Sequence, residues 1–333
     1  MPSYEGIGIF NMHVLLVNNT RIPALKYGGT ERDIWHQGDE LVKMGHQVSY
    51  LVAPGSTCPF ATYMLVYNPY LPLNPQIPDW ADVVHVHFPI QEPLKKPYMV
   101  TVHGNGKVGE VYNINTVFVS KDHAARHNST SFVYNGLGLK EYGPIDLKKN
   151  RKHLLFLAKT SRIEKNLSGA ISIATHIQEP LKILGGRRLS IKRGVSYAGM
   201  VGGAQKNTLL NEAKALLFPV RWHEPLGLAI LEALLFGMPV FGTPYGSLPE
   251  LINEERGFLS TRADEIALAA REHSSYDAIK CHQFIADQFT ARHMTEAYLQ
   301  LFEKVMNGLA LNLEPPRTLA TEIPRLLPYQ DLP

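Results

Sequence analysis

The sequence has few cysteines and no long apolar run. Only two of its 333 residues are cysteine, Cys58 and Cys281, and they lie far apart in the chain. This excludes a disulfide framework and is typical of a reducing compartment. The most apolar stretch, residues 226–241, is shorter than a membrane-spanning helix and contains Glu232. Residues 1–11 do not resemble a signal peptide. We therefore expect a cytoplasmic protein and leave open a peripheral contact with the inner face of a membrane.

The sequence also has little excess charge. It carries 33 lysine and arginine residues against 30 aspartate and glutamate residues, and 45% of its residues are hydrophobic. This balance is typical of a globular protein and is too weak for a nucleic-acid-binding protein. The basic clusters at Lys148–Lys152 and Arg187–Arg193 are interpreted as solvated loops. The alternative is contact with an anionic lipid surface or a phosphorylated acceptor.

The usual metal-binding motifs are absent. The sequence has no D-x-D pair to hold a divalent cation on a diphosphate, and no H-E-x-x-H. His85, His87 and His103 stand at expected strand ends, where imidazoles can share a metal. His123 and His127 are spaced i, i+4 but lack the glutamate of a zinc motif. We expect no metal site.

Short apolar runs alternate with helical patterns along the chain. The expected strands of the first half are residues 12–17, 47–53, 83–87, 98–103 and 116–120, with a helix over 30–44. The expected strands of the second half are residues 154–158, 181–185, 197–198, 215–219 and 239–242, with helices over 167–177, 207–213, 228–236 and 248–252. From residue 263 to about residue 307 the pattern is helical. This alternation predicts an α/β protein with parallel sheets covered on both faces.

The two series of strands predict two Rossmann-like domains in tandem. The expected limits are residues 1–148 and 149–292, followed by a C-terminal helix and tail over 293–333 that cross back to the first domain. Ligands in parallel sheets bind outside the carboxyl ends of the strands. The functional site is therefore expected in a cleft between the two domains.

The most informative segment runs from Phe218 to Ala233, where a buried strand, a polar loop and a helix follow one another. A helix that begins at Gly227 and Leu228 would offer free N–H groups and the positive end of its dipole, which suit a diphosphate. Glu224 is expected to accept hydrogen bonds from sugar hydroxyls, and Glu232 from ribose hydroxyls. The alternative is an acid near a helix cap and a solvated helix residue.

Two strand ends of the first half carry further candidates. Gly28 and Gly29 lie between the first strand and the first helix, where glycines permit close approach of a phosphate. No G-x-G-x-x-G follows that strand, so a dinucleotide site is not indicated. His103 ends a later strand and is followed by Gly104, which favours a place in the cleft over a purely structural histidine.

The stretch Lys159–Asn166 follows the first strand of the second half. A departing nucleoside diphosphate gains negative charge, which fixed cations stabilise where no metal is bound. Arg162 and Lys165 are the expected cations. Lys159 is either an alternative to Arg162 or part of a solvated loop.

These segments resemble the retaining glycosyltransferases of the GT-B fold, in particular the large family four. Glu224–Glu232 is similar to the E-x7-E signature of that family, and Gly237–Val240 and Gly246–Leu251 are similar to its G-x-P-V and G-x-x-P-E segments. Gly28-Gly29 and His103 match its glycine loop and its cleft histidine. The resemblance extends from about residue 12 to about residue 307.

One part of the pattern departs from that family. Lys165-Asn166 matches the end of the family's G-R-x-x-x-x-K pattern, but the arginine is displaced. Lys159 stands near its usual position with one residue too many before the lysine, and Arg162 stands closer. The sequence leaves open which of the two takes its place.

The resemblance implies two domains facing across a cleft, the first for an acceptor and the second for a nucleotide-sugar donor. It implies a retaining, metal-independent hexosyltransferase without a cofactor, with a UDP-sugar as the expected donor and a glycan, lipid or small molecule as acceptor. Loops 57–78 and 104–115 are expected to bind the acceptor. The alternatives are a sugar-nucleotide epimerase or phosphorylase, or a non-catalytic relative that binds nucleotide-sugars. The oligomeric state is left open.

Overall fold

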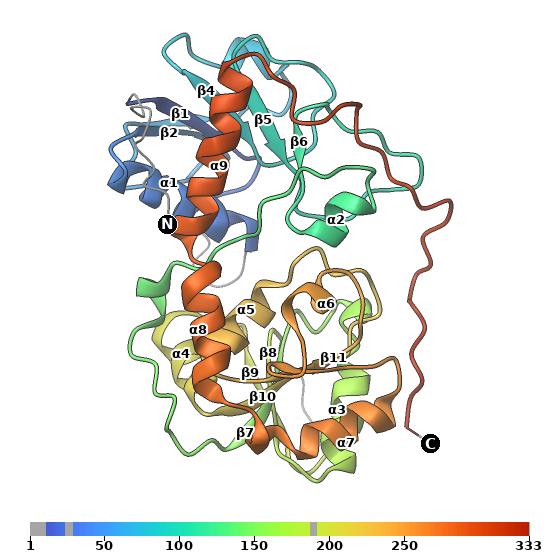
Figure 1. Cartoon of the computed structure of the whole chain (residues 1–333). Coiled ribbons are helices and arrows are strands. Elements are labelled where there is room, and N and C mark those ends of the chain that lie inside the picture. The colour runs from blue at the N-terminus through green and yellow to red at the C-terminus, as the bar shows by residue number, and fades with distance from the viewer. Residues whose placement is uncertain (1–10, 24–28, 187–191, 333) are drawn as a thin grey trace, which may run out of the picture.

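The computed structural model describes residues 11–23, 29–186 and 192–332 (Figure 1). Gly28 and residues 187–191, which belong to the basic cluster Arg187–Arg193, therefore lie outside the described residues. Within the described residues the chain forms two six-stranded parallel sheets, one in each half, with helices packed around them. The expected α/β fold with two parallel-sheet domains is confirmed.

The first sheet has the strand order β3-β2-β1-β4-β5-β6. Its strands are β1 (His13–Val17), β2 (Gln47–Val52), β3 (Tyr63–Val66), β4 (Val83–Val86), β5 (Tyr98–Thr101) and β6 (Thr116–Val117), and its helices are α1 (Gly29–Lys43) and α2 (Lys121–Ala125). Every residue of β1 and β4 is buried, as expected for strands covered on both faces. The order reverses between β1 and β4, and this switch point opens a crevice at their carboxyl ends.

The second sheet repeats this arrangement in the order β12-β11-β10-β7-β8-β9. Its strands are β7 (His153–Leu157), β8 (Leu181–Leu184), β9 (Val195–Gly199), β10 (Ala213–Phe218), β11 (Val240–Gly242) and β12 (Gly257–Leu259). Its helices are α3 (Leu167–His176), α4 (Gly203–Asn211), α5 (Leu228–Leu235), α6 (Leu248–Leu251), α7 (Ala263–Arg271) and α8 (Ala278–Gln288). Its switch point lies between β7 and β10. The loops after these two strands are therefore neighbours in space.

Four elements differ from the sequence-based expectation, and one of them is the short helix α2, which was not expected. β3 falls within residues 57–78, which were expected to be a loop, and β12 was not expected at all. Both are short strands at the edges of their sheets, so their sequences lack the fully buried pattern of a central strand. α4 begins at Gly203, four residues earlier than expected, because Gly202 acts as its N-cap and not as a break. None of the helices in the described residues has the length and apolar character that a bilayer crossing requires.

The chain passes between the two domains at a hinge made of two adjacent segments. The first segment is residues 135–137, which come after β6 and α2 in the chain. The second joins α8 to α9 (Ala291–Met306). Leu137 N–H donates to Phe289 O at 2.8 Å, and Ala291 N–H donates to Leu137 O at 2.9 Å. α9 then packs against α1 and β5 of the first domain (Figure 1). The hinge thus joins two segments that are about 150 residues apart in the sequence.

Gly136 allows the two hinge segments to pack closely, which gives a first prediction. A Cβ atom at this position would lie 2.2 Å from the backbone oxygen of Thr290. We expect Gly136→Ala to cost about 1–3 kcal/mol of unfolding free energy and to lower the melting temperature by several degrees. Gly104→Ala is the matched control, since a Cβ there meets nothing within 4 Å. Equal melting temperatures for the two variants would contradict this account of the hinge.

Candidate functional site

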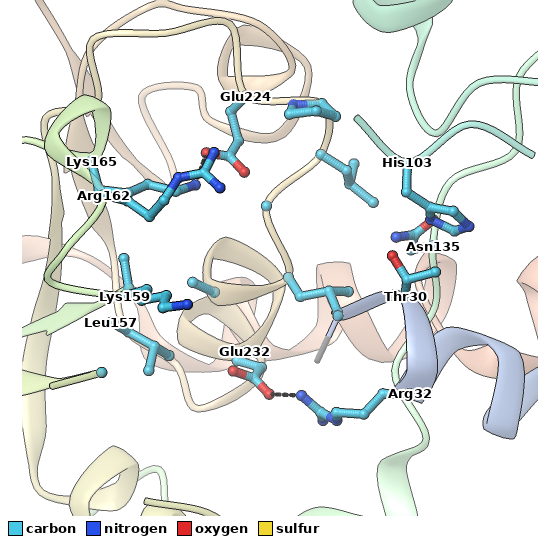
Figure 2. Close-up of a pocket in the computed structure, with 18 of the residues that line it drawn as sticks. Thr30, Arg32, His103, Asn135, Leu157, Lys159, Arg162, Lys165, Glu224 and Glu232 are labelled. Carbon is cyan, nitrogen blue, oxygen red and sulfur yellow. Dashed lines mark hydrogen bonds and ion pairs between the residues drawn. The ribbon is translucent and has the colours of Figure 1, made fainter. Parts of the chain in front are cut away.

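A cavity of about 620 Å³ lies between the two domains, at the carboxyl ends of both sheets (Figure 2). The first domain lines it with the start of α1, the loop after β5 and the hinge residue Asn135. The second domain lines it with the loops after β7 and β10 and with the start of α5. Every expected site residue that the structure describes lines this one cavity. They are Gly29, His103, Arg162, Lys165, Glu224, Gly227, Leu228 and Glu232.

Glu224 lies in the loop after β10, where two donors hold its carboxylate. Lys165 Nζ donates to Glu224 Oε2, and Trp222 Nε1 donates to the same oxygen at 2.8 Å. The Lys165 ammonium also lies 4.5 Å from the centre of the Trp222 ring, close enough for a cation–π contact. Glu224 Oε1 accepts no hydrogen bond within the described residues. It is therefore left for a ligand hydroxyl.

A glycine behind Glu224 fixes the path of this loop. Gly246 has φ +67°, and a Cβ atom there would lie 2.2 Å from the backbone oxygen of Glu224. Ser247 N–H donates to that same oxygen at 2.9 Å. The G-x-x-P-E segment thus supports Glu224 through the backbone, because only glycine combines this close approach with this conformation.

The N-terminus of α5 opens into the cavity. Its N-cap residue, Gly227, has φ +83° and no side chain to cap the helix. The first N–H groups of a helix have no partner inside it, so those of Leu228 and Ala229 are available to an anion. Gly29 of the first domain lies beside the start of α5, since a Cβ atom on it would be 3.4 Å from Leu228 Cδ1. The described glycine of the expected glycine loop and the expected anion site therefore adjoin the same part of the cavity.

Lys159 and Arg162 both line the cavity but differ in how they are held. The Arg162 guanidinium pairs with Glu164 and lies 5.6 Å from the Trp222 ring, and half of its side chain is exposed. Lys159 follows β7 directly and points its ammonium into the cavity (Figure 2). Its ammonium forms no hydrogen bond or ion pair with any other described residue, although its backbone oxygen accepts from Arg162 N–H at 3.0 Å. Lys159 is thus the cation with the most freedom to meet a ligand.

The loop that carries Lys165 is tied to the loop that carries Glu224. Asn166 has φ 54°, and its side chain caps α3 by accepting from Gly169 N–H at 3.1 Å. Its amide group donates to Pro219 O at 2.9 Å. The lysine–asparagine pair therefore joins the ends of β7 and β10 and holds Lys165 beside Glu224.

Glu232 is buried and already bound within the protein. Its carboxylate accepts from Arg32 Nη1 and from the Tyr142 hydroxyl at 2.8 Å each, and from Lys206 Nζ at 2.6 Å. Burial favours the neutral acid, but the charges of Lys206 and Arg32 outweigh it and lower the pKa of Glu232 to about 2. Glu232 is therefore ionised at neutral pH. Its expected contact with ribose hydroxyls stays a prediction, and Oε2, which accepts only from Lys206, is the atom to make it.

His103 lies beyond the end of β5, on the first-domain wall of the cavity beside Thr30 and Asn135 (Figure 2). Its Nε2 lies 3.2 Å from His87 Nδ1. Burial lowers the pKa of His103 to about 4. The imidazole that faces the cavity is therefore neutral at physiological pH and can act as a hydrogen-bonding group.

The neighbouring histidines bond within the protein. His85 shares hydrogen bonds with Gln37 and Thr101 at 2.9 and 2.7 Å. Burial also lowers the pKa values of His85 and His87 well below 6.5. In the part of the chain that the structure describes, no group of three or more histidine, cysteine, aspartate or glutamate side chains is arranged to hold a metal ion. The metal alternative therefore has no support from these side chains.

Four residues that shape the site were not expected from the sequence. Arg32 stands three residues after Gly29, and Trp222 lies within the segment from Phe218 to Ala233, so adjacency to those motifs was the only signal. Asn105, whose side chain donates to His223 O across the cavity, likewise follows His103 by two residues. Lys206 lies in the first turn of α4, which the sequence placed too late. No local motif marks it.

Comparison with known proteins gives a family match for part of the second half of the chain. Residues 146–274 match the family model described as glycosyl transferases group 1. The chain is 25% identical over 142 residues to N-acetyl-alpha-D-glucosaminyl L-malate synthase of Bacillus anthracis, which covers 39% of this chain and 36% of that protein. The chain spans less than half the length of the curated relatives that it matches.

Solved structures share the whole architecture. AviGT4, a glycosyltransferase involved in avilamycin A biosynthesis, superposes with a TM-score of 0.71 at 21% identity, covering 89% of this chain and 98% of its own. The Anabaena protein HepE, solved in complex with UDP and glucose, superposes with a TM-score of 0.63 at 13% identity, covering 88% and 100%. At this identity the likeness establishes the fold. The chain therefore adopts the GT-B fold, and its residues 146–274 match the family model of group 1 glycosyl transferases.

Proposed function

We propose that the chain is a retaining, metal-independent hexosyltransferase that uses a UDP-sugar. The observation that carries this proposal is the convergence of the Lys165–Glu224 pair with the open N-terminus of α5 on one cavity. A carboxylate suits the hydroxyls of a sugar, and the ammonium and helix N–H groups suit the diphosphate beside it. The group 1 family match over this half of the chain supports the same reading.

In the proposed reaction the protein positions the substrates and stabilises charge. An acceptor hydroxyl attacks the anomeric carbon from the side of the departing diphosphate. The bond from that carbon to the phosphate oxygen breaks, its electron pair stays with the diphosphate, and the hydroxyl proton passes to a phosphate oxygen. The configuration is thereby retained. Lys159, Lys165 and the start of α5 would stabilise the charge that develops on the diphosphate.

Uridine is the proposed base because the similar protein HepE was solved with UDP and with UDP-glucose. The acceptor is proposed to enter from the first domain. Of the two loops expected to bind it, 104–115 supplies Asn105 to the cavity, whereas 57–78 supplies no lining residue within the described chain. A cytoplasmic location and a peripheral membrane contact stay predictions.

The Lys165–Glu224 pair gives the first test. We expect Lys165→Ala and Glu224→Ala each to lower kcat/KM for sugar transfer by about 100-fold or more, because each removes a charge placed for the donor. Lys214 and Glu179 form a comparable pair, 2.7 Å apart, near the start of β10 and away from the cleft. Lys214→Ala and Glu179→Ala are the controls and should retain activity. Transfer that survives in both cleft variants would refute the assignment.

A second test separates Lys159 from Arg162. We expect Lys159→Ala to weaken UDP binding about 10-fold, and Arg162→Ala to weaken it less, because the Arg162 guanidinium is already paired with Glu164. Isothermal titration with UDP measures both effects. Uridine, which lacks the diphosphate, should bind equally to the two variants. A larger loss in Arg162→Ala would show that the arginine takes the phosphate position.

A third test concerns metal ions. The proposed charge stabilisation comes from side chains and a helix N-terminus, so we expect sugar transfer to continue in excess EDTA at the rate measured with added Mg²⁺ or Mn²⁺. Initial rates with and without the chelator measure this. Activity that disappears in EDTA and returns with either metal would contradict metal independence.

A further inference from the structure

The chain after α9 returns to the second domain. From the end of α9 it runs along the outside of the molecule and reaches the second domain near α7 (Figure 1). The hinge lies on the opposite side of the cleft in the same view. We call residues 311–330 the strap. The domains are thus connected on both sides of the cleft, by the hinge on one side and by the strap on the other.

The first anchor of the strap is on the first domain. Residues 316–319 lie between the loop at residues 110–112 and the end of α2, and they form backbone hydrogen bonds with both. The bonds are Tyr112 N–H to Pro316 O (2.8 Å), Arg317 N–H to His127 O (2.9 Å), Thr318 N–H to Glu110 O (2.9 Å) and Leu319 N–H to Arg126 O (3.0 Å). Pro316 and Thr318 are buried there. This part of the strap therefore packs on the first domain and is hydrogen-bonded to it.

The second anchor is on the loop that carries Glu224. Leu327 N–H donates to Arg221 O at 2.8 Å, and Arg221 Nε donates back to Leu327 O at 2.9 Å. The Tyr245 hydroxyl donates to Pro328 O at 2.6 Å. Gln330 then pairs with the backbone on either side of Arg262. The strap is thus hydrogen-bonded to Arg221, the residue before Trp222.

Hydrogen bonds of the Asn105 side chain link the two anchor regions across the cleft. Arg126 Nη2 donates to Asn105 Oδ1 at 2.8 Å, and Asn105 Nδ2 donates to His223 O at 2.7 Å. The carbonyl oxygens of Arg126 and Arg221 are also among those that accept hydrogen bonds from the strap. The strap, the two arginines, Asn105 and the backbone at His223 therefore form one closed circuit across the cleft.

The segment between the two anchors is exposed to solvent. Residues 320–325 are exposed, and residues 320–326 form no hydrogen bond with either domain in the described chain. The eight steps from Leu319 to Leu327 span at most about 28 Å when fully extended. Such a segment contributes no packing and acts by limiting how far its two anchors can separate.

We propose that the strap is a latch that holds the cleft closed on the side away from the hinge and so positions the Trp222–Glu224 loop for the donor. The inference rests on the proposed function, since a closed cleft is what brings Gly29 beside Leu228 at the start of α5, where the diphosphate is proposed to bind. If the closed form is only partly populated, apparent donor affinity falls by that fraction. The latch would therefore act on donor affinity more than on the chemical step.

The test cuts the strap without removing either anchor. Residues 321–325 of the full-length protein are replaced by the recognition sequence of a site-specific protease, and the cut and uncut forms are compared. We expect the cut form to bind UDP about 3- to 10-fold more weakly by isothermal titration. Small-angle X-ray scattering should show a larger radius of gyration for the cut form without UDP. Saturating UDP should restore the radius of the uncut form.

A point variant tests the second anchor separately. Leu327→Pro removes the N–H that binds Arg221 O, whereas Leu326→Pro changes a neighbour whose N–H forms no hydrogen bond within the described chain. We expect Leu327→Pro to raise the KM for the donor with kcat largely unchanged, and Leu326→Pro to match the wild type. A merely structural anchor would lower the melting temperature without this split between KM and kcat.

Equal UDP affinity and equal scattering for the cut and uncut forms would overturn the latch. Unfolding of the cut form would make the strap part of the fold and would overturn it as well. If the uncut form binds no UDP, the proposed donor is wrong, and scattering of the cut and uncut forms alone decides whether the strap restrains the domains.

Discussion

The buried carboxylate of Glu232 is the constraint on which the arrangement of the two domains depends. An ionised carboxylate that is 2% exposed must be compensated by nearby donors, because a buried unpaired charge is strongly destabilising. Arg32 supplies that charge from the first domain, and Lys206 supplies it from the second. Tyr142, which follows the hinge, completes the set. Moving the two domains apart would take Arg32 away from the buried Glu232 carboxylate. This ion pair therefore favours the arrangement in which the cleft is closed.

A second carboxylate of the second domain acts in a similar way at the cleft edge. Glu250 accepts from the backbone N–H groups of Lys121 and Asp122 at 3.1 and 2.6 Å, at the start of α2 in the first domain. It also accepts from the Tyr134 hydroxyl at 2.6 Å. The E-x7-E and G-x-x-P-E segments thus each supply one second-domain glutamate that binds to the first domain. Motifs that mark a ligand site in the sequence also hold the two walls of that site together.

The sequence predicted the central strands well because their apolar residues are contiguous. β1, β4, β7 and β10 are buried throughout or nearly so, and they surround the two switch points that position the site. The edge strands β3 and β12 escaped because their burial is partial. For the site, residues within motifs could be found from spacing, whereas Lys206 could not, since its place beside Glu232 depends on how α4 packs.

The central claim is that the start of α5, with Lys165 and Glu224, forms a site for a sugar diphosphate. A crystal structure of the protein with a UDP-hexose tests it most directly. We predict that the phosphate bonded to the sugar lies within about 3 Å of the Leu228 or Ala229 N–H groups and of Lys165, with a sugar hydroxyl on Glu224. A nucleotide bound elsewhere, or a diphosphate turned away from the start of α5, would contradict it.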